Sequence, residues 1–330
     1  MTEHFPILIL LVPLFGALIV VLLGRERPEQ CWITSLISLG LSSIISLFTI
    51  IIVLSDKVQE IRYRMGGWDP ESTVFEVGIE LRVDILAALV VFAVTFVGFV
   101  NTIYSKTRAE AEAQGKVPFF YALIQLLIVG LCGIVMTNDA FNLYVLIEIT
   151  SLTSYALIAM GNRRAALSSF NYVIMGTIGA SFYLLGVGYL YIKTGTLNID
   201  DIRMVLGNDK LWEHQSIIVA FIFIMLGVWT KMAFFPLHGW LPNAYAYAPS
   251  MTGTFMAPLM TKVMVYVMIR VMLWLFGYEF VYSDQHVWGE LVIWMSVIAI
   301  VAGSLLALAR TDIKKMLTYL IVAEVGYMVG

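Results

Sequence analysis

Residues 231–249, which read KMAFFPLHGWLPNAYAYAP, are the stretch of sequence that most strongly predicts the fold. They begin with a lysine inside an apolar segment, and four of the nine prolines of the chain lie between residues 236 and 258. Proline removes a backbone donor and disfavours helix at the residue before it. We therefore expect a helix that breaks near Pro236. At membrane depth, a broken helix that carries a lysine is typical of transporters, where the irregular backbone is buried in protein or lines a wet cavity.

Long apolar segments flank this stretch on both sides. Of the 330 residues, 60% are hydrophobic and 13% are charged, whereas a soluble domain has roughly 25% charged residues. A bilayer core of about 30 Å requires about 20 apolar helical residues. A partial tenth span begins near Met316 and runs 15 residues to Gly330. The nine complete spans are predicted at 6–24, 31–54, 82–104, 118–137, 140–160, 166–192, 216–235, 255–277 and 287–309. The expected fold class is an all-α polytopic membrane protein.

The connections after the odd-numbered spans carry lysine and arginine, whereas the intervening short loops, 138–139 and 278–286, have none. Short loops rich in these residues stay on the cytoplasmic side, so we expect the amino terminus to lie outside and the chain to reside in the cell membrane. The first span lacks a basic leading region and a small-residue cleavage site, so it should remain in the mature protein. The basic residues on these connections are Arg25, Arg27, Lys106, Arg108, Lys116, Arg163, Arg164, Arg310, Lys314 and Lys315.

Two connections are long enough to hold structure of their own. In 61–83, apolar and polar residues alternate on either side of Gly66-Gly67, which predicts an external hairpin. The second connection, 193–215, is rich in aspartate and is interpreted as a solvated connector with a short surface helix.

Several function classes find no support in the sequence. No basic cluster suggests nucleic-acid binding, and no C-x-x-C, haem or G-x-G-x-x-G motif suggests a redox cofactor. Cys31 and Cys132 have no second thiol or histidine at ligand spacing, so they are interpreted as packing residues. We therefore expect no cofactor, no metal and no nucleic-acid partner.

Three charged residues, Glu148, Lys231 and Lys262, lie well inside apolar segments. An ionisable group at that depth is costly unless it faces a polar cavity or an opposite charge, so each is a candidate functional residue. Ser151 and Tyr155 share a helix face with Glu148. A carboxylate near an ammonium favours the charged form of both groups, while desolvation favours the neutral forms, so small movements can switch protonation. This arrangement predicts a proton relay.

Each of these residues also has a simpler interpretation. Glu148 and Lys231 could form a static ion pair that orients helices, and Lys262 could extend its ammonium to the cytoplasmic surface. His238, beside Pro236, is a further candidate proton carrier that could equally be a hydrogen-bonding loop residue. Arg270 lies on the outer half of its helix and is interpreted as an interfacial anchor.

The chain also resembles a known family along essentially its whole length. The similar family is the proton-conducting antiporter family, which includes the large membrane-arm subunits of respiratory complex I, related membrane hydrogenases and the multisubunit sodium/proton antiporters. FNLY before Glu148 and TKV at 261–263 most resemble the D-type subunits of the Mrp antiporters. The stretches that carry the resemblance are FNLYVLIE at 141–148, SYAL at 154–157, residues 231–250, TK at 261–262 leading to Arg270, GGW at 66–68 leading to Asp84, and DIKKMLTY at 312–319 followed by GY at 326–327.

The resemblance implies about fourteen spans built from two inverted five-helix repeats. It also implies that Glu148 pairs with Lys231, that Lys231 passes a proton to the central Lys262, and that the chain works among other membrane subunits of a large assembly. The transported ion would be the proton, and sodium is a weaker expectation because no oxygen-rich cluster is seen. We expect an amino-terminal three-helix region with the hairpin in 1–117, the first repeat in 118–277 and the start of the second in 278–330.

The chain departs from the family pattern at several positions. Glu71 interrupts the usual turn after GGW, and Met264 stands where glycine is common. Glu324 stands where glutamine or histidine is common, and it is expected to be a buried acid that serves as a relay group or as a polar packing residue. The second repeat should hold another broken helix with its own charged residue, and the sequence ends before it. We interpret the sequence either as an incomplete gene product or as a chain whose remainder is on another polypeptide.

The expected function is that of a proton-translocating subunit of a cation/proton antiporter or of a complex I-like NADH:quinone oxidoreductase, with no redox centre in this chain. The alternatives are a structural or assembly subunit with a static buried ion pair, a non-functional truncated paralogue, and a quinone-handling subunit, which the lack of cofactor ligands disfavours. Whether sodium antiport or redox chemistry drives the assembly depends on its partner subunits.

Overall fold

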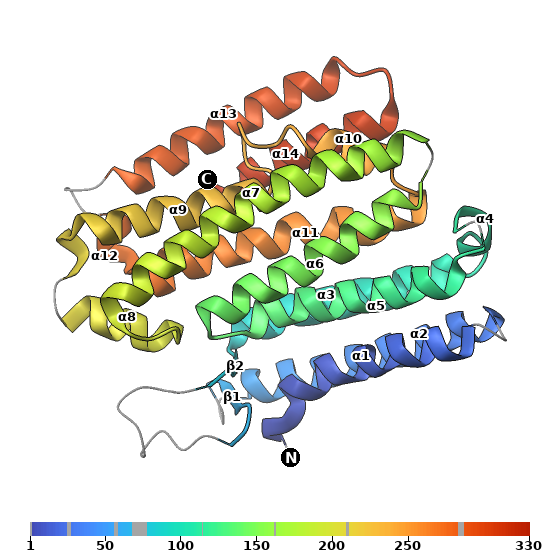
Figure 1. The fold of residues 1–330 in the computed structure, drawn as a ribbon, viewed down its shortest axis with the longest axis horizontal. Coiled ribbons are helices and arrows are strands. Elements are labelled where there is room, and N and C mark those ends of the chain that lie inside the picture. The colour runs from blue at the N-terminus through green and yellow to red at the C-terminus, as the bar shows by residue number, and fades with distance from the viewer. Residues whose placement is uncertain are drawn as a thin grey trace.

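Long helices lie side by side along one direction in the computed structural model (Figure 1). The structure describes residues 2–24, 28–55, 59–67, 78–113, 115–161, 163–208, 211–282 and 287–330. Four residues of interest in the sequence, Arg25, Arg27, Trp68 and Glu71, lie outside the described residues.

Eight of the described helices are long and apolar enough to cross a membrane. They are α1 (Phe5–Gly24), α2 (Pro28–Leu54), α3 (Ile85–Ser105), α5 (Val117–Met136), α6 (Ala140–Ala159), α7 (Arg163–Thr194), α11 (Ser250–Ile269) with its continuations η4 (Arg270–Gly277) and α12 (Tyr278–Val281), and α13 (Trp288–Leu308). The shorter helices are η1 (Thr2–His4), α4 (Ala109–Glu112), α8 (Ile199–Asn208), η3 (Leu211–Glu213), α9 (Gln215–Lys231), α10 (Leu241–Tyr247) and α14 (Ile313–Val329).

Of the nine complete spans expected from the sequence, the one at 216–235 differs from the structure, where it corresponds to α9. It has 17 residues and ends at Lys231, whereas the apolar run predicted an end at residue 235. Residues 232–235 are apolar but not helical, because the chain turns at Ala233, where φ is 56°, ahead of Pro236. Within the described residues the structure therefore has eight helices of full spanning length and one shorter apolar helix at the break.

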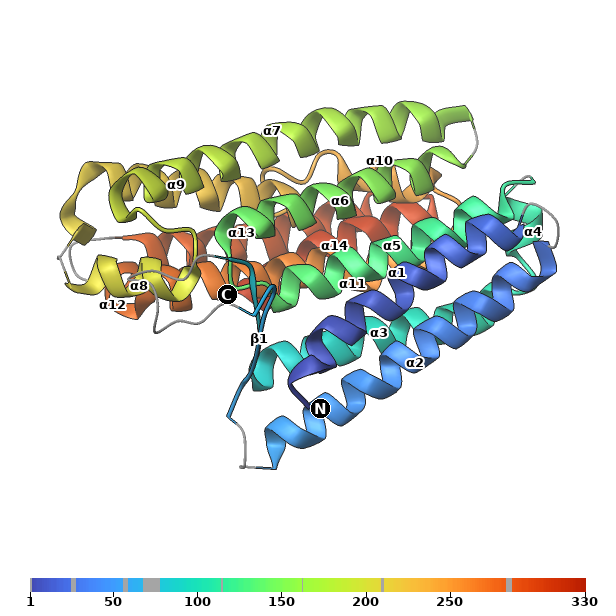
Figure 2. The ribbon, with the colours of Figure 1, turned by 60° about the horizontal axis from the view of Figure 1, so that its bottom comes forward.

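Helices that follow one another along the chain mostly pack as neighbours, as short connections favour. α1 packs on α2 and α5, α2 on α3, α5 on α6, α6 on α7, α7 on α9, and α13 on α14. In Figure 2, α1, α2 and α3 form a group on one side of the molecule, and α7 and α9 lie on the opposite side. The helices α5 and α11 lie between these groups.

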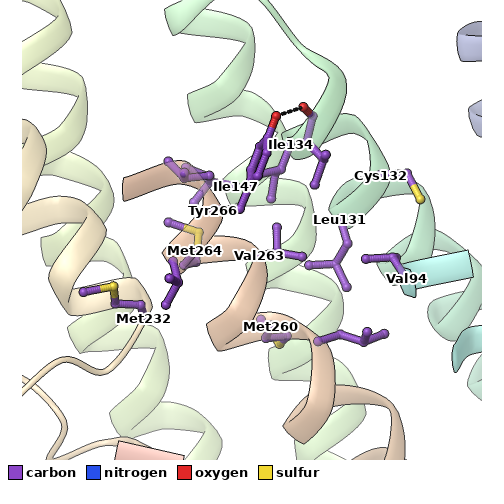
Figure 3. Close-up of a cluster of buried hydrophobic side chains, with 14 of the residues drawn as sticks. Val94, Leu131, Cys132, Ile134, Ile147, Met232, Met260, Val263, Met264 and Tyr266 are labelled. Carbon is purple, nitrogen blue, oxygen red and sulfur yellow. Dashed lines mark hydrogen bonds between the residues drawn. The ribbon is translucent and has the colours of Figure 1, made fainter. Parts of the chain in front are cut away.

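The apolar core lies where α5, α6 and α11 meet. Leu131 and Ile134 of α5, Ile147 of α6, and Met260 and Val263 of α11 are all buried and lie together in Figure 3. α5 is apolar around its circumference, which is typical of a helix enclosed by others. The free cysteines, one on α2 and one on α5, are fully buried.

The external hairpin predicted within 61–83 consists of β1 (Ile61–Arg64) and β2 (Glu80–Val83), and residues 68–77 between them lie outside the described residues. The strands are antiparallel, with Ile61 opposite Val83 and Arg64 opposite Glu80. Ile61 and Val83 are buried against the helix ends. We call this end of the bundle the hairpin face, and the end that carries residues 106–116 and 309–315 the basic face.

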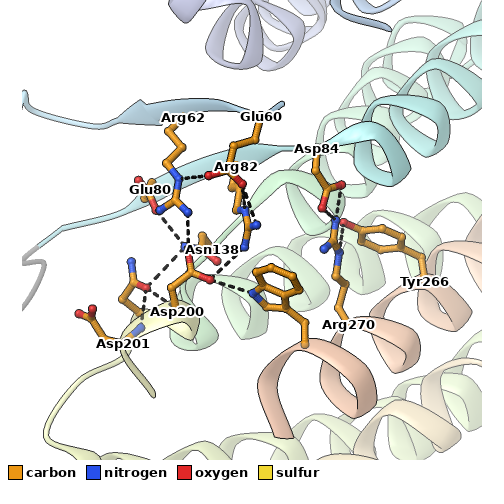
Figure 4. A network of polar contacts seen from close by, with 12 residues as sticks. Glu60, Arg62, Glu80, Arg82, Asp84, Asn138, Asp200, Asp201, Tyr266 and Arg270 are labelled. Atoms are coloured by element: carbon orange, nitrogen blue, oxygen red, sulfur yellow. Dashed lines mark hydrogen bonds and ion pairs between the residues drawn. The ribbon is translucent and has the colours of Figure 1, made fainter. Parts of the chain in front are cut away.

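A polar network holds the hairpin against the helices (Figure 4). Arg62 and Arg82, on facing strands, pair with Asp200 of α8 at 3.0 and 2.9 Å. Trp274 of η4 donates its indole N–H to the same carboxylate at 2.8 Å. Burial on its own raises the pKa of Asp200, but the bond from Trp274 and the two arginine charges lower this pKa below its ordinary value. The segment 193–215 thus contributes Asp200 to a half-buried polar network and is not only a solvated connector.

Candidate functional site

Lys231 is the last residue of α9, and its side chain is only 5% exposed. Its ammonium donates to Ser151 Oγ at 2.7 Å and lies 3.4 Å from Glu148 Oε1. Glu148 and Ser151 face the lysine together because they lie about one turn apart on α6. The structure therefore brings a buried ammonium, a carboxylate and a hydroxyl into one contact between two helices.

The break after Lys231 has a local cause. Ala233 has positive φ, and regular helix resumes only at α10, which has Pro242 in its first turn. The indole N–H of Trp240 donates to the carbonyl of Thr230 at 2.9 Å, which satisfies an acceptor that the end of α9 leaves without a helical partner. The helix end at Lys231 is thus stabilised by a residue of the proline-rich stretch itself.

Gly176 of α7 faces the lysine, and stacked aromatic rings lie beside this glycine. Tyr172 stacks on Trp240 with ring centroids 3.9 Å apart, and Tyr155 meets Tyr172 edge-on at 4.6 Å. A Cβ at Gly176 would lie 3.4 Å from Lys231 Nζ and would overlap the hydroxyl of Tyr155. Tyr172 and Gly176 were not predicted as site residues, because nothing in their local sequence shows which helix they face.

Lys262 of α11 has a different partner. Its ammonium lies 2.6 Å from Glu324 Oε2 of α14, and it also donates to the carbonyl of Ala257 at 3.4 Å. The side chain of Lys262 is 21% exposed and that of Glu324 is 50% exposed. The expectation that Glu324 is a buried acid is therefore wrong for the described chain, because α14 turns this side chain toward the bundle surface.

His238 lies in the irregular segment between α9 and α10. Its ring lies 5.2 Å from the ring of Phe235 and 6.3 Å from that of Tyr319 on α14, measured between centroids. Within the described residues, these ring contacts place His238 beside α14 rather than in the contact of Lys231 with Glu148.

Arg270 was interpreted as an interfacial anchor, but it has specific protein partners (Figure 4). It donates to both carboxylate oxygens of Asp84, the N-cap of α3, and its Nε donates to the hydroxyl of Tyr266 at 2.8 Å. Burial alone raises the pKa of Asp84, but the bonds from Arg270 and from the Ala87 N–H lower it below its ordinary value. Lys262 and Tyr266 of α11 and Arg270, the first residue of η4, follow at intervals of four, a spacing that could have suggested one polar face.

The described residues contain no group of three or more histidine, cysteine, aspartate or glutamate side chains placed to hold a metal ion. A cavity of about 40 Å³ lies on the hairpin face beside Arg270, with Asn138, Tyr266 and Trp274 in its lining. It has room for about one water molecule. The ion pairs that the structure shows among the helices are Lys231 with Glu148, Lys262 with Glu324, and Arg270 with Asp84.

The chain is similar in sequence to several known proteins. A family model described as NADH:quinone oxidoreductase/Mrp antiporter, TM, matches residues 137–330. The chain is 39% identical over 332 residues to the N-type subunit of the NADH-quinone oxidoreductase of Desulforudis audaxviator, an alignment that covers 100% of this chain and 64% of the relative. It is 28% identical over 326 residues to the D-type subunit of the Na(+)/H(+) antiporter of Bacillus subtilis, covering 98% of this chain and 62% of the relative. The chain thus spans less than two thirds of the length of these curated relatives.

Solved structures show the same fold. A chain of the membrane-bound sulfane sulfur reductase, an archaeal respiratory membrane complex, superimposes with a TM-score of 0.86 at 29% identity, covering 97% of this chain and 63% of that chain. A chain of the Mrp complex from Dietzia sp. DQ12-45-1b superimposes with a TM-score of 0.83, covering 99% of this chain and 57% of that chain. At 22% identity, the second likeness concerns the fold alone.

Proposed function

This chain belongs to the NADH:quinone oxidoreductase/Mrp antiporter membrane family, and from this premise we propose that it translocates protons as one membrane subunit of a larger assembly. The assembly is either a multisubunit cation/proton antiporter or a complex I-like oxidoreductase, since relatives of both kinds are similar over nearly the whole chain. Subunits that co-purify with the chain would distinguish the two, because a redox assembly must contain cofactor-binding partners.

The contact of Lys231 with Glu148 and Ser151 is the observation that carries the proposal. The side chain of Lys231 is 5% exposed, so the charge of its ammonium depends on the neighbouring carboxylate more than on bulk water. Protonating Glu148, or moving it away, would leave a buried charge without its partner and favour release of a proton from the lysine. The irregular segment that follows Lys231 allows such a movement without breaking a continuous helix.

We assign Glu148 and Lys231 as the switch, Lys262 as the central relay and His238 as a further proton carrier. α11, which carries Lys262, packs against both α6 and α9, the two helices of the switch. This packing supports a short transfer between the two lysines. In this assignment, 118–277 is the first of two inverted five-helix repeats and 278–330 is the start of the second.

The same proposal places the hairpin face and the amino terminus outside the cell. Glu112 accepts a hydrogen bond from the Met251 N–H at 2.9 Å, and Lys314 donates to Ser250 Oγ at 3.1 Å. The two basic connections, 106–116 and 309–315, therefore meet at one end of α11, as loops retained on the cytoplasmic side would. An amino-terminal tag that is inaccessible from outside intact cells would contradict this orientation.

Proton flux into vesicles that contain the assembled complex tests the relay. Lys231→Ala and Glu148→Ala are each expected to lower flux about 100-fold, as removal of a positioned proton-transfer group does. Lys193→Ala, at the exposed end of α7, is the matched control and should retain flux. Normal assembly with unchanged flux in both site variants would refute the relay and favour a static ion pair.

A further inference from the structure

A polar cavity of about 210 Å³ lies at the basic face, at the opposite end of α14 from Gly330. It is bounded by α4, the connection between α6 and α7, the end of α10, and the starts of α11 and α14. In Figures 1 and 2, α4 and the connection between α6 and α7 lie at the same end of the bundle. The cavity has room for several water molecules or for a small polar group. Its lining includes the side chains of Glu112, Tyr247, Ser250 and Lys314.

Three cations border this cavity. Lys314 Nζ donates to Ser250 Oγ at 3.1 Å. Arg164 donates to the hydroxyl of Tyr247 at 3.1 Å, and Lys315 Nζ lies 5.2 Å from the centre of the Tyr247 ring. The bonds from Arg164 and Lys315 to this hydroxyl lower the pKa of Tyr247 below its ordinary value, which indicates a positive potential at the cavity.

The partners of these cations within the described residues are hydroxyl oxygens and an aromatic ring, and none of the three forms an ion pair with a described carboxylate. The two described acids nearby have other partners. Glu112 accepts from the Met251 N–H at 2.9 Å, at the start of α11. Asp312 accepts from the backbone N–H groups that begin α14. The side chains therefore leave an excess of positive charge at the cavity.

The helix ends add to this excess. α7 and α14 begin beside the cavity, and the start of a helix carries a positive charge of roughly half an elementary charge. Neither helix has an acidic residue in its first turn. Arg164 and Lys314 are each the second residue of their helix, where the helix dipole repels a cation. An anion bound in the cavity would offset both repulsions.

The position of the cavity favours a lipid as the source of this anion. Two of the membrane-spanning helices, α6 and α7, end and begin beside it, and the headgroups of a bilayer lie at the level where such helices end. Tyr247 is of the residue type that is enriched at this level. Leu167, one turn after Arg164 on α7, is apolar and exposed, so it offers a surface to an acyl chain.

We propose that this cavity binds the phosphate group of an anionic membrane phospholipid through Arg164, Lys314 and Lys315. The phosphate oxygens accept charge-assisted hydrogen bonds from the guanidinium and the two ammonium groups. The hydroxyls of Tyr247 and Ser250 are further donors. The bound headgroup ties the starts of α7 and α14 to the end of α10. A free phosphate ion offers the same oxygens but has no acyl chain to lie on α7.

The test titrates phosphatidylglycerol into the assembled complex in a neutral detergent and measures the bound lipid by native mass spectrometry. The double variant Arg164→Gln with Lys314→Gln removes two of the three cations and should weaken binding about fivefold for each charge, or roughly 30-fold in all. Lys116→Gln is the matched control, because it removes an exposed charge at the same face but outside the cavity lining, and it should keep the affinity. Arg164→Lys with Lys314→Arg keeps both charges and should keep most of the affinity.

Inorganic phosphate and phosphatidylcholine, titrated in the same way, distinguish the sources of the phosphate group. Tight binding of phosphatidylglycerol that the double variant loses, with weak binding of the other two, supports the proposal. Inorganic phosphate that binds as tightly would overturn the lipid in favour of a free anion, and phosphatidylcholine that binds as tightly would overturn recognition by charge. Equal affinities in the double variant and in Lys116→Gln would overturn the site itself.

A second variant covers the case in which the double variant fails to assemble. Lys314→Gln alone then decides, because this side chain is exposed and its replacement should leave the packing intact. An affinity for phosphatidylglycerol equal to that of Lys116→Gln would overturn the site, and a fall of about fivefold would support it. Lipid binding is measured without proton flux, so the result does not depend on the proton relay.

Discussion

Gly227→Ala should separate α7 from α9 and displace Lys231. Gly227 faces α7 directly, and a Cβ at this position would lie 2.7 Å from the carbonyl oxygen of Gly179 and 2.8 Å from the backbone nitrogen of Tyr183. Both contacts are with backbone atoms, which cannot rotate away as a flexible side chain could. Lys231 lies one helical turn further along α9, so a shift of α9 is carried to the site.

The size of the effect follows from the overlap. Ordinary contacts of a Cβ begin near 3.4 Å, so the two helices must move apart by about 0.7 Å at this point. Overpacking of this kind destabilises a protein by about 1–3 kcal/mol. A displacement of this size along the bond between Lys231 and Ser151 of α6 would lengthen it from 2.7 Å to about 3.4 Å, the long end of the hydrogen-bond range. We therefore expect a lower unfolding temperature together with a reduction in proton flux of roughly tenfold.

The matched control is Gly188→Ala on α7, where an added Cβ would meet no atom within 4 Å. Alanine there should be neutral or stabilise the helix by up to about 1 kcal/mol. Thermal unfolding of the purified complexes, measured side by side, compares the two variants, and vesicle flux reports on the site. If Gly227→Ala unfolds at the temperature of Gly188→Ala and keeps its flux, the close packing of α7 on α9 does not position Lys231.

Three further predictions concern single contacts. Asp200 has a pKa below its ordinary value of 3.8, so its pairing contributes fully above that pH and is lost as the pH falls through the lower folded pKa. The protection of β1 and β2 from hydrogen exchange, relative to the intrinsic exchange rate at each pH, should therefore fall in acid, and Asp200→Asn should already show low protection at neutral pH. Ser151→Ala removes a bond to a charged group and should lower proton flux about tenfold, whereas Ser151→Thr keeps the hydroxyl and most of the flux. Trp274→Phe should speed up hairpin exchange by removing the N–H bond to Asp200, and slow exchange in that variant would show that the two arginines suffice.

The membrane-spanning helices could be predicted closely from the sequence. The predicted ends of α1, α2, α3, α5, α6, α7 and α13 agree with the structure within three residues. The prediction was poorer next to proline. α9 ends at Lys231 although the apolar run continues, and α11 begins at Ser250, five residues before its predicted start. Hydropathy reports where a segment is apolar, but it does not report where backbone hydrogen bonding stops.

The candidate site could be predicted in part. Glu148, Lys231 and Lys262 were predicted as candidates because each is a charge in an apolar run, and the face shared by Glu148 and Ser151 followed from helical spacing. The partner of Lys262 could not be found in this way, because Glu324 lies 62 residues away along the chain. Asp84 and Arg270 are separated by 186 residues, and local spacing says nothing about such a pair.

The amino-acid sequence alone was enough to establish that the chain crosses a membrane many times and that a few charged groups lie at depth. The reason is that the bilayer penalises polar groups within each segment independently of the rest of the chain. Which charges meet depends on the rotation of each helix about its axis and on which helices are neighbours. Packing between distant segments sets both, and it brings Lys231 to Glu148, Lys262 to Glu324 and Arg270 to Asp84.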